Sequence, residues 1–408
     1  MVPRDFVYEK FSEYYKNSSE TISPPSLFDQ REFGFFLLKE KVMLRHKRFG
    51  KKTDLKSFLS EVVPSDVYHS CAYYENPDFE MSKKGWRGSD LVFDIDADHI
   101  PTTCNKIHDE WSCGKCGFTG KGITPDVCPT CGGMKFDTKT WPCELCLQSA
   151  KEETEKLVVM LEEDFGFSPE EIHVFFSGHR GYHVHVETES VRTLDTAARK
   201  EIVDYVSGLG FALLDEAIEE KRQGRQAVKV FVLQDFGWRR RLKMGMEKFV
   251  MSATKEDLRA VGILNYNLLR KKEAILQKCF EEGRWDSVKG VNVETWRRLA
   301  RRIRDLESAK IDTVVTTDLH RLIRMAGTLH GKTGLLKVEF PASKIAGFDP
   351  FKEAVAFKKG TARVSVSSAP EFRLCGEVFG PYRNQTVELS TAAAVLLVCK
   401  NRAEVVQD

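Results

Sequence analysis

Cysteine is concentrated in one short stretch of this sequence, and that stretch limits how the chain can fold more than any other feature. Seven of the eleven cysteines lie between Cys104 and Cys146. Two Cys-x2-Cys pairs stand eleven residues apart, beside glycines that permit tight turns. The pairs are Cys113 with Cys116 and Cys128 with Cys131. In a reducing compartment, four thiolates at this spacing are typical of a closed tetrahedral zinc ribbon rather than of disulfides.

A further pair, Cys143 and Cys146, lies downstream of Cys104 and His108. These four could form a second site of the Cys₃His kind, wrapped around the ribbon, although the cysteine pairs could also be shared differently. In either site protein ligands fill the tetrahedron and leave no position for water, so we expect structural rather than catalytic zinc. The sequence predicts one to two zinc ions per chain, and two if both sites form.

The second informative feature is an apolar run that ends in two carboxylates, Leu91–Asp96. Side chains in a strand alternate between faces, so Phe93 and Ile95 can enter a core while the two aspartates share the other face. Asp94 and Asp96 would repel each other and raise one pKa unless a hard cation such as Mg²⁺ or Mn²⁺ neutralised them. An isolated Asp-x-Asp is most often only a solvated strand end, so other segments must decide.

Size and charge exclude some classes of protein. With 408 residues and 42% hydrophobic content, the chain can form two or three globular modules. Its longest apolar run, Ala392–Cys399, is too short to span a bilayer, and the N-terminus lacks a signal-peptide core, so we expect a cytoplasmic protein without membrane segments. The net charge is only +2, so any nucleic acid must be bound by local basic patches.

The order of the expected elements indicates a mixed α/β fold. Residues 149–165 have the periodicity of an amphipathic helix that Gly166 would end. Residues 172–176 and 182–186 read as strands joined by a turn. A helix-rich, highly charged stretch follows from about 190 to 310, and strand-like segments return from about 311. We therefore expect a helix-backed sheet to which the C-terminal part of the chain returns.

Two segments are suited to phosphate binding. The turn Ser177–Gly181 combines a hydroxyl, His179, Arg180 and two glycines, and can cradle a triphosphate through backbone amides and the guanidinium. The stretch 311–334 adds a carboxylate, arginines and a glycine-flanked His330 and Lys332. It is not a Walker P-loop, because Ala326 stands where that pattern needs glycine. Alone, each segment reads equally well as an ordinary turn.

Taken together and in order, these segments resemble the catalytic small subunit of archaeo-eukaryotic DNA primases in its archaeal form. The matching segments are Arg31–Phe35, Phe93–Asp96, Ser177–His183, Arg321–Arg324 and His330–Lys332. The resemblance implies an α/β (α+β) primase fold with an RRM-like catalytic sheet, a zinc site near the catalytic strand, and synthesis of short primers on single-stranded DNA.

The resemblance also implies roles for individual residues. Asp94 and Asp96 correspond to the pair that binds two Mg²⁺ or Mn²⁺ ions, and Asp312 to the third catalytic aspartate. The positions that correspond to nucleotide-binding residues are Ser177, His179, Arg180, His183, Arg324, His330 and Lys332, with Glu32 and Arg45 from the N-terminal part. The ligands of the family's zinc site correspond to Cys104, His108, Cys143 and Cys146. The 113–131 ribbon is then an insertion within that site.

On this basis we expect three regions: a catalytic core at 1–103, 147–190 and 311–408, a zinc-binding segment at 104–146, and a helix-rich subdomain at 191–310. The implied activity is two-metal nucleotidyl transfer from NTPs, or from dNTPs. The implied partner is a large subunit that carries an iron-sulfur cluster, in a heterodimeric replicative primase of an archaeal cell.

Two other classes of function remain open from the sequence. A primase-polymerase or an end-joining polymerase of the same superfamily would share the core but would extend supplied primers or act on ends. A non-catalytic zinc-ribbon protein that binds nucleic acid would explain the cysteines. That alternative gives no function to the Asp94 and Asp96 pair, to Asp312 or to the 177–181 turn.

Overall fold

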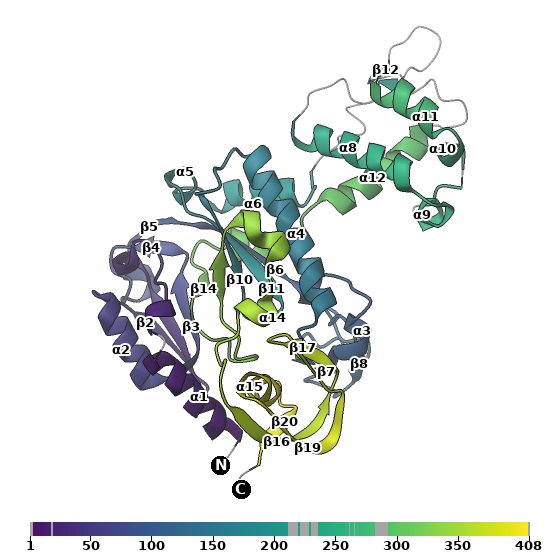
Figure 1. Cartoon of the computed structure of the whole chain (residues 1–408). Helices are drawn as coiled ribbons and strands as arrows, with labels where there is room; N and C mark the ends of the chain where they lie inside the picture. The colour runs from purple at the N-terminus through teal and green to yellow at the C-terminus, as the bar shows by residue number, and fades with distance from the viewer. Residues whose placement is uncertain are drawn as a thin grey trace. The chain divides into compact units, whose positions relative to one another are not determined.

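The chain is described by a computed structural model (Figure 1) over residues 3–17, 19–210, 219–220, 228–229, 236–260, 262–264, 266–281 and 293–406. It forms two compact units. The first comprises Met1–Glu155, Pro169–Lys200 and Lys310–Asp408, and the second comprises Lys156–Ser168 and Glu201–Ala309. Every residue predicted above for a catalytic, nucleotide or zinc site belongs to the first unit. Within the described residues, no helix has the length and apolar character needed to cross a membrane.

The first unit contains a four-stranded antiparallel sheet in the order β15-β10-β11-β6, here called the acidic sheet because it carries Asp94 and Asp96. Its strands are β6 (Leu91–Asp96), β10 (Ile172–Phe176), β11 (Gly181–Val186) and β15 (Val338–Phe340). The strands predicted at 91–96 and 172–176 are confirmed with these bounds. Because β15 pairs with β10, the expected return of the C-terminal part to this sheet is also confirmed.

Helix α4 (Glu144–Glu163) differs from the prediction at both ends, which were expected at residues 149 and 165. It begins earlier because the chain turns into the helix directly at the Cys143–Cys146 pair, where the Leu147 N–H donates to the Cys143 carbonyl over 3.0 Å. The predicted stop at Gly166 is confirmed by its left-handed conformation, with φ of 75°. The helix therefore connects the cysteine-rich segment to β10.

A second antiparallel sheet in the first unit has the order β14-β3-β1-β2. Its strands are β1 (Phe33–Leu37), β2 (Met43–Lys47), β3 (Pro64–Ser70) and β14 (Leu322–Arg324). Helices α1 (Pro3–Asn17) and α2 (Lys52–Val62) pack against each other. The buried side chains of Phe33, Phe35 and Leu59 form part of the core here. Strand β14 pairs with β3 and so brings the 321–334 segment to the N-terminal part of the chain.

The C-terminal part forms a three-stranded sheet in the order β19-β16-β20, packed against a buried helix. These elements are β16 (Thr361–Ala369), β19 (Tyr382–Ser390), α15 (Thr391–Cys399) and β20 (Ala403–Val405). The cysteine-rich segment forms its own small sheet, β8-β7-β9. Its elements are α3 (Asn105–His108), β7 (Glu110–Cys113), β8 (Thr119–Lys121) and β9 (Phe136–Lys139). Short elements complete the unit: β4 (Ala72–Tyr74), β5 (Trp86–Ser89), α5 (Glu189–Arg192), α13 (Thr313–Thr317), α14 (Pro350–Glu353), β17 (Phe372–Leu374) and β18 (Glu377–Phe379).

The described residues of the second unit are mainly helical, and parts of the stretch predicted to be helix-rich, such as 211–218 and 282–292, lie outside the described residues. Its described helices include α8 (Gly237–Ser252), α9 (Lys255–Ala260), α10 (Asn267–Arg270), α11 (Lys272–Ile275) and α12 (Val293–Glu307), and α6 (Thr196–Val206) runs into it. Helices α8 and α12 pack through buried apolar side chains such as Leu242, Met246 and Ile303. The molecule as a whole is a mixed α/β structure with several separate antiparallel sheets, which agrees with the α+β expectation.

Candidate functional site

The two carboxylates of β6 lie at the edge of the acidic sheet, opposite β11. Asp94 is the register partner of His183, and Asp96 that of Gly181. Phe93 and Ile95 are fully buried on the other face, so the predicted alternation is confirmed. A side chain at position 181 would place its Cβ 2.1 Å from the Ile95 carbonyl oxygen, so only glycine lets β11 approach β6 this closely.

Asp312 lies beside this pair although it is far away in sequence. Its backbone N–H donates to the Asp94 carbonyl over 2.8 Å. Its carboxylate accepts the Val314 N–H over 2.9 Å and so caps α13, which packs beside β6. The structure thus brings together the three aspartates that the resemblance joins, and the catalytic role of each stays a prediction.

The carboxylates of Asp94 and Asp96 both have raised pKa values, and burial is the main cause. Burial, and then the charges of Asp96 and Asp312, raise the pKa of Asp94 to about 7. Burial also raises the pKa of Asp96, although the nearby Arg180 opposes that change. A cluster of carboxylate oxygens that cannot all be ionised without a counter-charge is a suitable donor set for a hard divalent cation. The three carboxylates lie close enough for Asp96 and Asp312 to act on the pKa of Asp94, and their binding of Mg²⁺ or Mn²⁺ stays a prediction.

The raised pKa of Asp94 predicts a pH dependence of stability in buffers without Mg²⁺ or Mn²⁺. The folded-state pKa of Asp94 lies above the unfolded value, so the folded chain holds the proton longer and stability falls as pH rises from about 4 to about 7. We expect the free energy of unfolding to decline by roughly 2 to 4 kcal/mol over this range. Denaturant titrations of the unaltered chain and of Asp94→Asn in the same buffers without chelator measure it, because any zinc that is released near pH 4 is then lost from both proteins. Asp94→Asn should flatten the decline, and an equal decline in both proteins would contradict the assignment.

The turn between β10 and β11 packs against the 327–334 loop and is hydrogen-bonded to it. The Ser177 hydroxyl accepts the N–H groups of His179 and Gly181, each over 3.3 Å. Gly178 has φ of 88°, and a Cβ there would lie 3.0 Å from the His330 Cβ. The Thr333 hydroxyl donates to the Gly178 carbonyl over 2.5 Å. The two segments that the sequence marked for phosphate binding therefore form one continuous surface.

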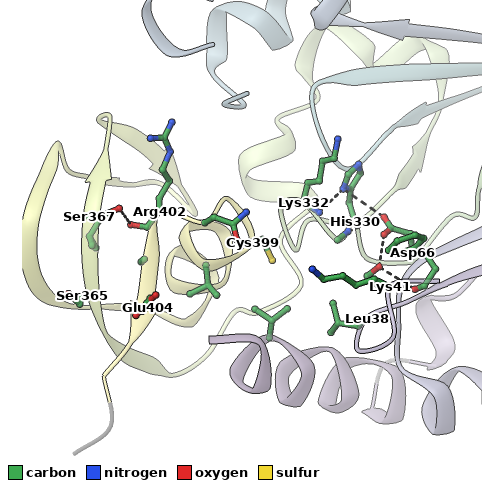
Figure 2. A pocket seen from close by; sticks show the side chains of 18 of the residues that line it. Leu38, Lys41, Asp66, His330, Lys332, Ser365, Ser367, Cys399, Arg402 and Glu404 are labelled. Atoms are coloured by element: carbon green, nitrogen blue, oxygen red, sulfur yellow. Dashed lines mark hydrogen bonds and ion pairs between the residues drawn. The ribbon is translucent and has the colours of Figure 1, made fainter. Parts of the chain in front are cut away.

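Asp66 accepts hydrogen bonds from two groups of the 324–332 segment, the Arg324 side chain and the Gly331 backbone. Arg324 is buried and its Nη1 donates to Asp66 Oδ1 over 2.5 Å, while the Gly331 N–H donates to the same oxygen over 3.1 Å. Figure 2 shows Asp66, His330 and Lys332 together at one wall of a cavity of about 1060 Å³. Arg402 and Cys399 contribute to its lining from the C-terminal part. A cavity of this size can accommodate a nucleotide, but neither the acidic pair nor the 177–181 turn is among the residues that line it.

The site histidines are neutral hydrogen-bonding groups. Burial, followed by nearby cations, lowers the pKa of His179, His183 and His330 well below the ordinary value. The Lys332 N–H donates to His330 Nδ1 over 3.0 Å, so the neutral His330 ring carries its proton on Nε2 and can donate it to an anion. The rings of His179 and His330 stack with centroids 5.1 Å apart. His183 Nε2 lies 3.6 Å from Asp94 Oδ1.

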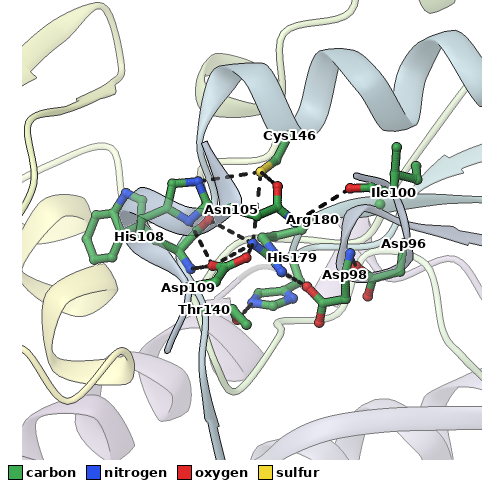
Figure 3. Close-up of polar contacts among 12 residues, drawn as sticks. Asp96, Asp98, Ile100, Asn105, His108, Asp109, Thr140, Cys146, His179 and Arg180 are labelled. Atoms are coloured by element: carbon green, nitrogen blue, oxygen red, sulfur yellow. Dashed lines mark hydrogen bonds and ion pairs between the residues drawn. The ribbon is translucent and has the colours of Figure 1, made fainter. Parts of the chain in front are cut away.

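Arg180 has partners that the sequence did not indicate. Its side chain is fully buried, and the guanidinium pairs with Asp98 and with Asp109, the latter at 2.8 Å from Nη1 to Oδ2 (Figure 3). These contacts give Arg180 a structural role between two carboxylates. Its predicted contact with a triphosphate stays a prediction.

Glu32 and Arg45 contact each other in the second sheet. The buried Glu32 carboxylate accepts from Arg45 Nε over 3.0 Å, from Lys84 Nζ over 2.5 Å and from the His46 N–H over 3.1 Å. Burial alone would raise the pKa of Glu32, but Lys84 and Arg45 outweigh it and hold that pKa below its usual value. Glu32 therefore orients two cations, and its contribution to nucleotide binding stays a prediction.

The clustered cysteines form two groups with the membership expected from the sequence. In each group the potential ligand atoms lie within 4.8 Å of one another: Cys104, His108, Cys143 and Cys146, and separately Cys113, Cys116, Cys128 and Cys131. Sulfur–sulfur distances are 3.4 Å for Cys104 and Cys146, and 3.6 and 3.7 Å in the second group. Tetrahedral Zn–S bonds of about 2.3 Å place sulfurs roughly 3.8 Å apart, so both groups fit zinc.

A chain of contacts runs from the first cysteine group to the acidic pair. His108 Nδ1 lies 2.7 Å from Asp109 Oδ1, which leaves Nε2 for a metal. Asp109 pairs with Arg180, Arg180 pairs with Asp98, and the Asp98 N–H donates to Asp96 Oδ1 over 2.9 Å. Figure 3 shows these residues side by side. The sequence contains one signal for this contact: Asp109 directly follows His108, and a carboxylate is a common orienting partner of a ligand histidine.

Metal analysis of the purified chain is expected to find two zinc ions, one for each cysteine group. The double substitution Cys113→Ser and Cys116→Ser should reduce the content to one ion, because it removes half the ligands of one site. Cys375→Ser is the control, since Cys375 is exposed and belongs to neither group, and it should leave two ions. One ion or none in the unaltered chain contradicts the prediction.

Comparison with known proteins agrees with this arrangement. A family model described as DNA primase small subunit matches residues 136–341. The DNA primase small subunit PriS of Cenarchaeum symbiosum is 33% identical over 97% of this chain and 96% of that protein. Those of Methanococcoides burtonii and Thermoplasma volcanium are each 32% identical over 98% of this chain, covering 97% and 99% of their own lengths. The resemblance found in the sequence is confirmed, and the chain belongs to the DNA primase small subunit family.

Proposed function

We propose that this chain is the catalytic subunit of a primase that synthesises short primers on single-stranded DNA from NTPs, or from dNTPs, on a primase fold with an RRM-like catalytic sheet. One observation carries the proposal: the Asp94 carboxylate, which Asp96 and Asp312 repel, stands beside a turn and a loop that hold neutral histidines and cations. Such a site combines a place for divalent cations with a place for a triphosphate.

In the proposed reaction a 3′-hydroxyl oxygen attacks the α-phosphorus of the incoming nucleotide. A new P–O bond forms, the bond to the bridging oxygen of the β-phosphate breaks, and pyrophosphate leaves while the hydroxyl proton passes to solvent. Two Mg²⁺ or Mn²⁺ ions, when bound, stabilise the charge on the attacking and leaving oxygens. Asp94 and Asp96 would hold both ions, and Asp312 would bind one of them.

The remaining residues would position and neutralise the triphosphate. Arg324 and Lys332 supply positive charge, while His330 donates from Nε2 because its Nδ1 accepts the Lys332 N–H. His183, beside Asp94, would orient the phosphate nearest the acidic pair. Because phosphoryl transfer needs little covalent help from a protein, this positioning is most of what the chain must provide.

The zinc clusters would have a structural part in this function. Each is filled by protein ligands, and the Cys104 group contacts Arg180 through Asp109. The proposal also includes a heterodimer with an iron-sulfur large subunit, as the family resemblance implies, and a place in the cytoplasmic replication machinery.

Incorporation of labelled NTPs on a single-stranded DNA template, with Mg²⁺ or Mn²⁺ and with or without the large subunit, tests the proposal. New primers formed without a supplied 3′ end support a primase. Extension of a supplied primer only would favour the primase-polymerase or end-joining alternative. Binding of DNA with no incorporation under any condition would favour the non-catalytic zinc-ribbon alternative and overturn the proposal.

A further inference from the structure

Lys400, in the C-terminal part of the chain, lies against the phosphate-binding turn. It follows α15, whose residues from Thr391 to Val398 are buried, so the position of its backbone is firmly set. Its N–H donates to the Leu396 carbonyl over 3.0 Å. Its amine lies 2.7 Å from His179 Nε2. No sequence motif pointed to this residue, which is 221 positions from His179.

The contact fixes what each group can offer to a ligand. When Lys400 is charged, its ammonium can only donate hydrogen bonds, so His179 Nε2 is then the acceptor and the ring proton lies on Nδ1. His179 therefore cannot donate from Nε2 while Lys400 holds it. The ammonium keeps two further N–H groups, which makes Lys400 the donor on this side of the turn.

Lys400 lies among both cations and carboxylates. The charged and titratable groups that act on it or respond to it are Arg180, Lys332, His179, His330, Cys399, Asp96 and Asp109. Burial, and then Arg180 and Lys332, lower the pKa of Lys400 to about 7. Arg180 already pairs with Asp98 and Asp109, and the Asp96 carboxylate accepts from Asp98. An anionic ligand would relieve the crowding of Lys400 and Lys332.

The position of Lys400 indicates which part of a nucleotide it faces. Its neighbours His179, His330 and Lys332 belong to the turn and loop proposed for the phosphates, whereas the nucleophile would lie at Asp94 and Asp96. Cys399, the preceding residue, lines the cavity shared by His330 and Lys332. The C-terminal part of the chain therefore lies against the turn and the loop proposed for the phosphates.

We propose that Lys400 binds the β- and γ-phosphates of the incoming nucleotide, the part that leaves as pyrophosphate. The inference rests on the proposed function and adds to it a ligand from the C-terminal part of the chain. Lys400 neutralises the leaving group together with Lys332, and it donates to phosphate oxygens in place of His179 Nε2. A charged hydrogen bond of this kind changes affinity by about tenfold.

The test measures displacement of a fluorescent ATP analogue by ATP, inorganic pyrophosphate and AMP, all with Mg²⁺. In Lys400→Ala we expect affinities for ATP and pyrophosphate about tenfold weaker, with AMP changed less than twofold, since AMP lacks the β- and γ-phosphates. Lys400→Arg should restore most of the loss because it keeps the charge. Lys359→Ala, at an exposed lysine of the same part of the chain, is the matched control and should leave all three affinities unchanged.

The outcomes separate this inference from the proposed function. If the unaltered chain binds neither ATP nor pyrophosphate, the proposed function fails. If it binds both and Lys400→Ala binds them equally well, only the Lys400 inference fails. Equal losses for ATP and AMP in Lys400→Ala and Lys400→Arg, with a lower unfolding midpoint, would show that Lys400 only supports the turn, and would overturn the inference.

Discussion

Asp94→Asn is expected to reduce nucleotide incorporation by roughly 10³-fold while the chain still folds. The amide keeps the size of the side chain but lacks the charge that would hold a divalent cation beside Asp96. The fold should be retained because burial and the charges of Asp96 and Asp312 already raise the pKa of Asp94 to about 7, so removing its charge relieves repulsion. The measurement is incorporation of labelled NTPs on single-stranded DNA, together with the unfolding midpoint.

The control for this prediction is Asp54→Asn, which changes an exposed carboxylate in the first turn of α2 and should leave incorporation within twofold of the unaltered chain. Asp96→Asn should behave as Asp94→Asn does. Substantial residual synthesis by either of these two variants would refute their role in metal binding. Loss of activity accompanied by unfolding would show only that β6 needs the aspartates for stability.

Arg180→Met is expected to lower the free energy of unfolding by about 3 to 5 kcal/mol. Arg180 is fully buried between Asp98 and Asp109, and removing it leaves two carboxylates without their counter-charge. Asp109 would also lose the partner that holds it against His108, so zinc retention should fall in the same variant. Denaturant unfolding and zinc content after dialysis measure the two effects.

Arg87→Met provides the comparison for this prediction. The Arg87 and Glu75 pair is exposed and spans 3.6 Å, so its loss should cost less than about 1 kcal/mol. The loss in free energy of unfolding for Arg180→Lys should lie between those of Arg87→Met and Arg180→Met, because an ammonium keeps the charge but cannot span both carboxylates. If Arg180→Met weakened nucleotide binding with no change in stability or zinc content, the contacts in Figure 3 would be incidental and the phosphate role would be primary.

The sequence allowed the local features of the site to be predicted. Alternation along Leu91–Asp96 predicted the strand and the shared face of its aspartates, and the Cys-x2-Cys spacing predicted the Cys113 group. The Cys104 group was assigned through the family resemblance, because spacing alone left it open. These features depend on the period of a strand and on ligand spacing, which a short window of sequence contains. The bounds of α4 were wrong because the Cys143–Cys146 turn leads directly into the helix, which periodicity does not reveal.

Contacts between distant segments could not be predicted in this way. Asp66 binds Arg324 across 258 positions, and Lys400 reaches His179 across 221. Neither residue stands in a pattern that distinguishes it from a solvated surface charge. Arg180 was recognised as a functional cation, but its carboxylate partners depend on how the cysteine-rich segment folds back on β11. The sequence therefore indicated that the 177–181 turn could bind phosphate. Only the tertiary structure shows that Arg180 is already paired with two carboxylates and that Lys400 reaches the turn.

The central claim is that the acidic pair and the two phosphate segments hold a metal-bound nucleoside triphosphate. The most direct test is a crystal structure of the chain with Mn²⁺ and a non-hydrolysable NTP, with anomalous diffraction used to locate manganese. The account predicts an anomalous peak at the carboxylates of Asp94 and Asp96, and phosphates against the 177–181 turn and the 330–332 segment. Manganese and triphosphate bound elsewhere, with the acidic pair empty, would contradict it.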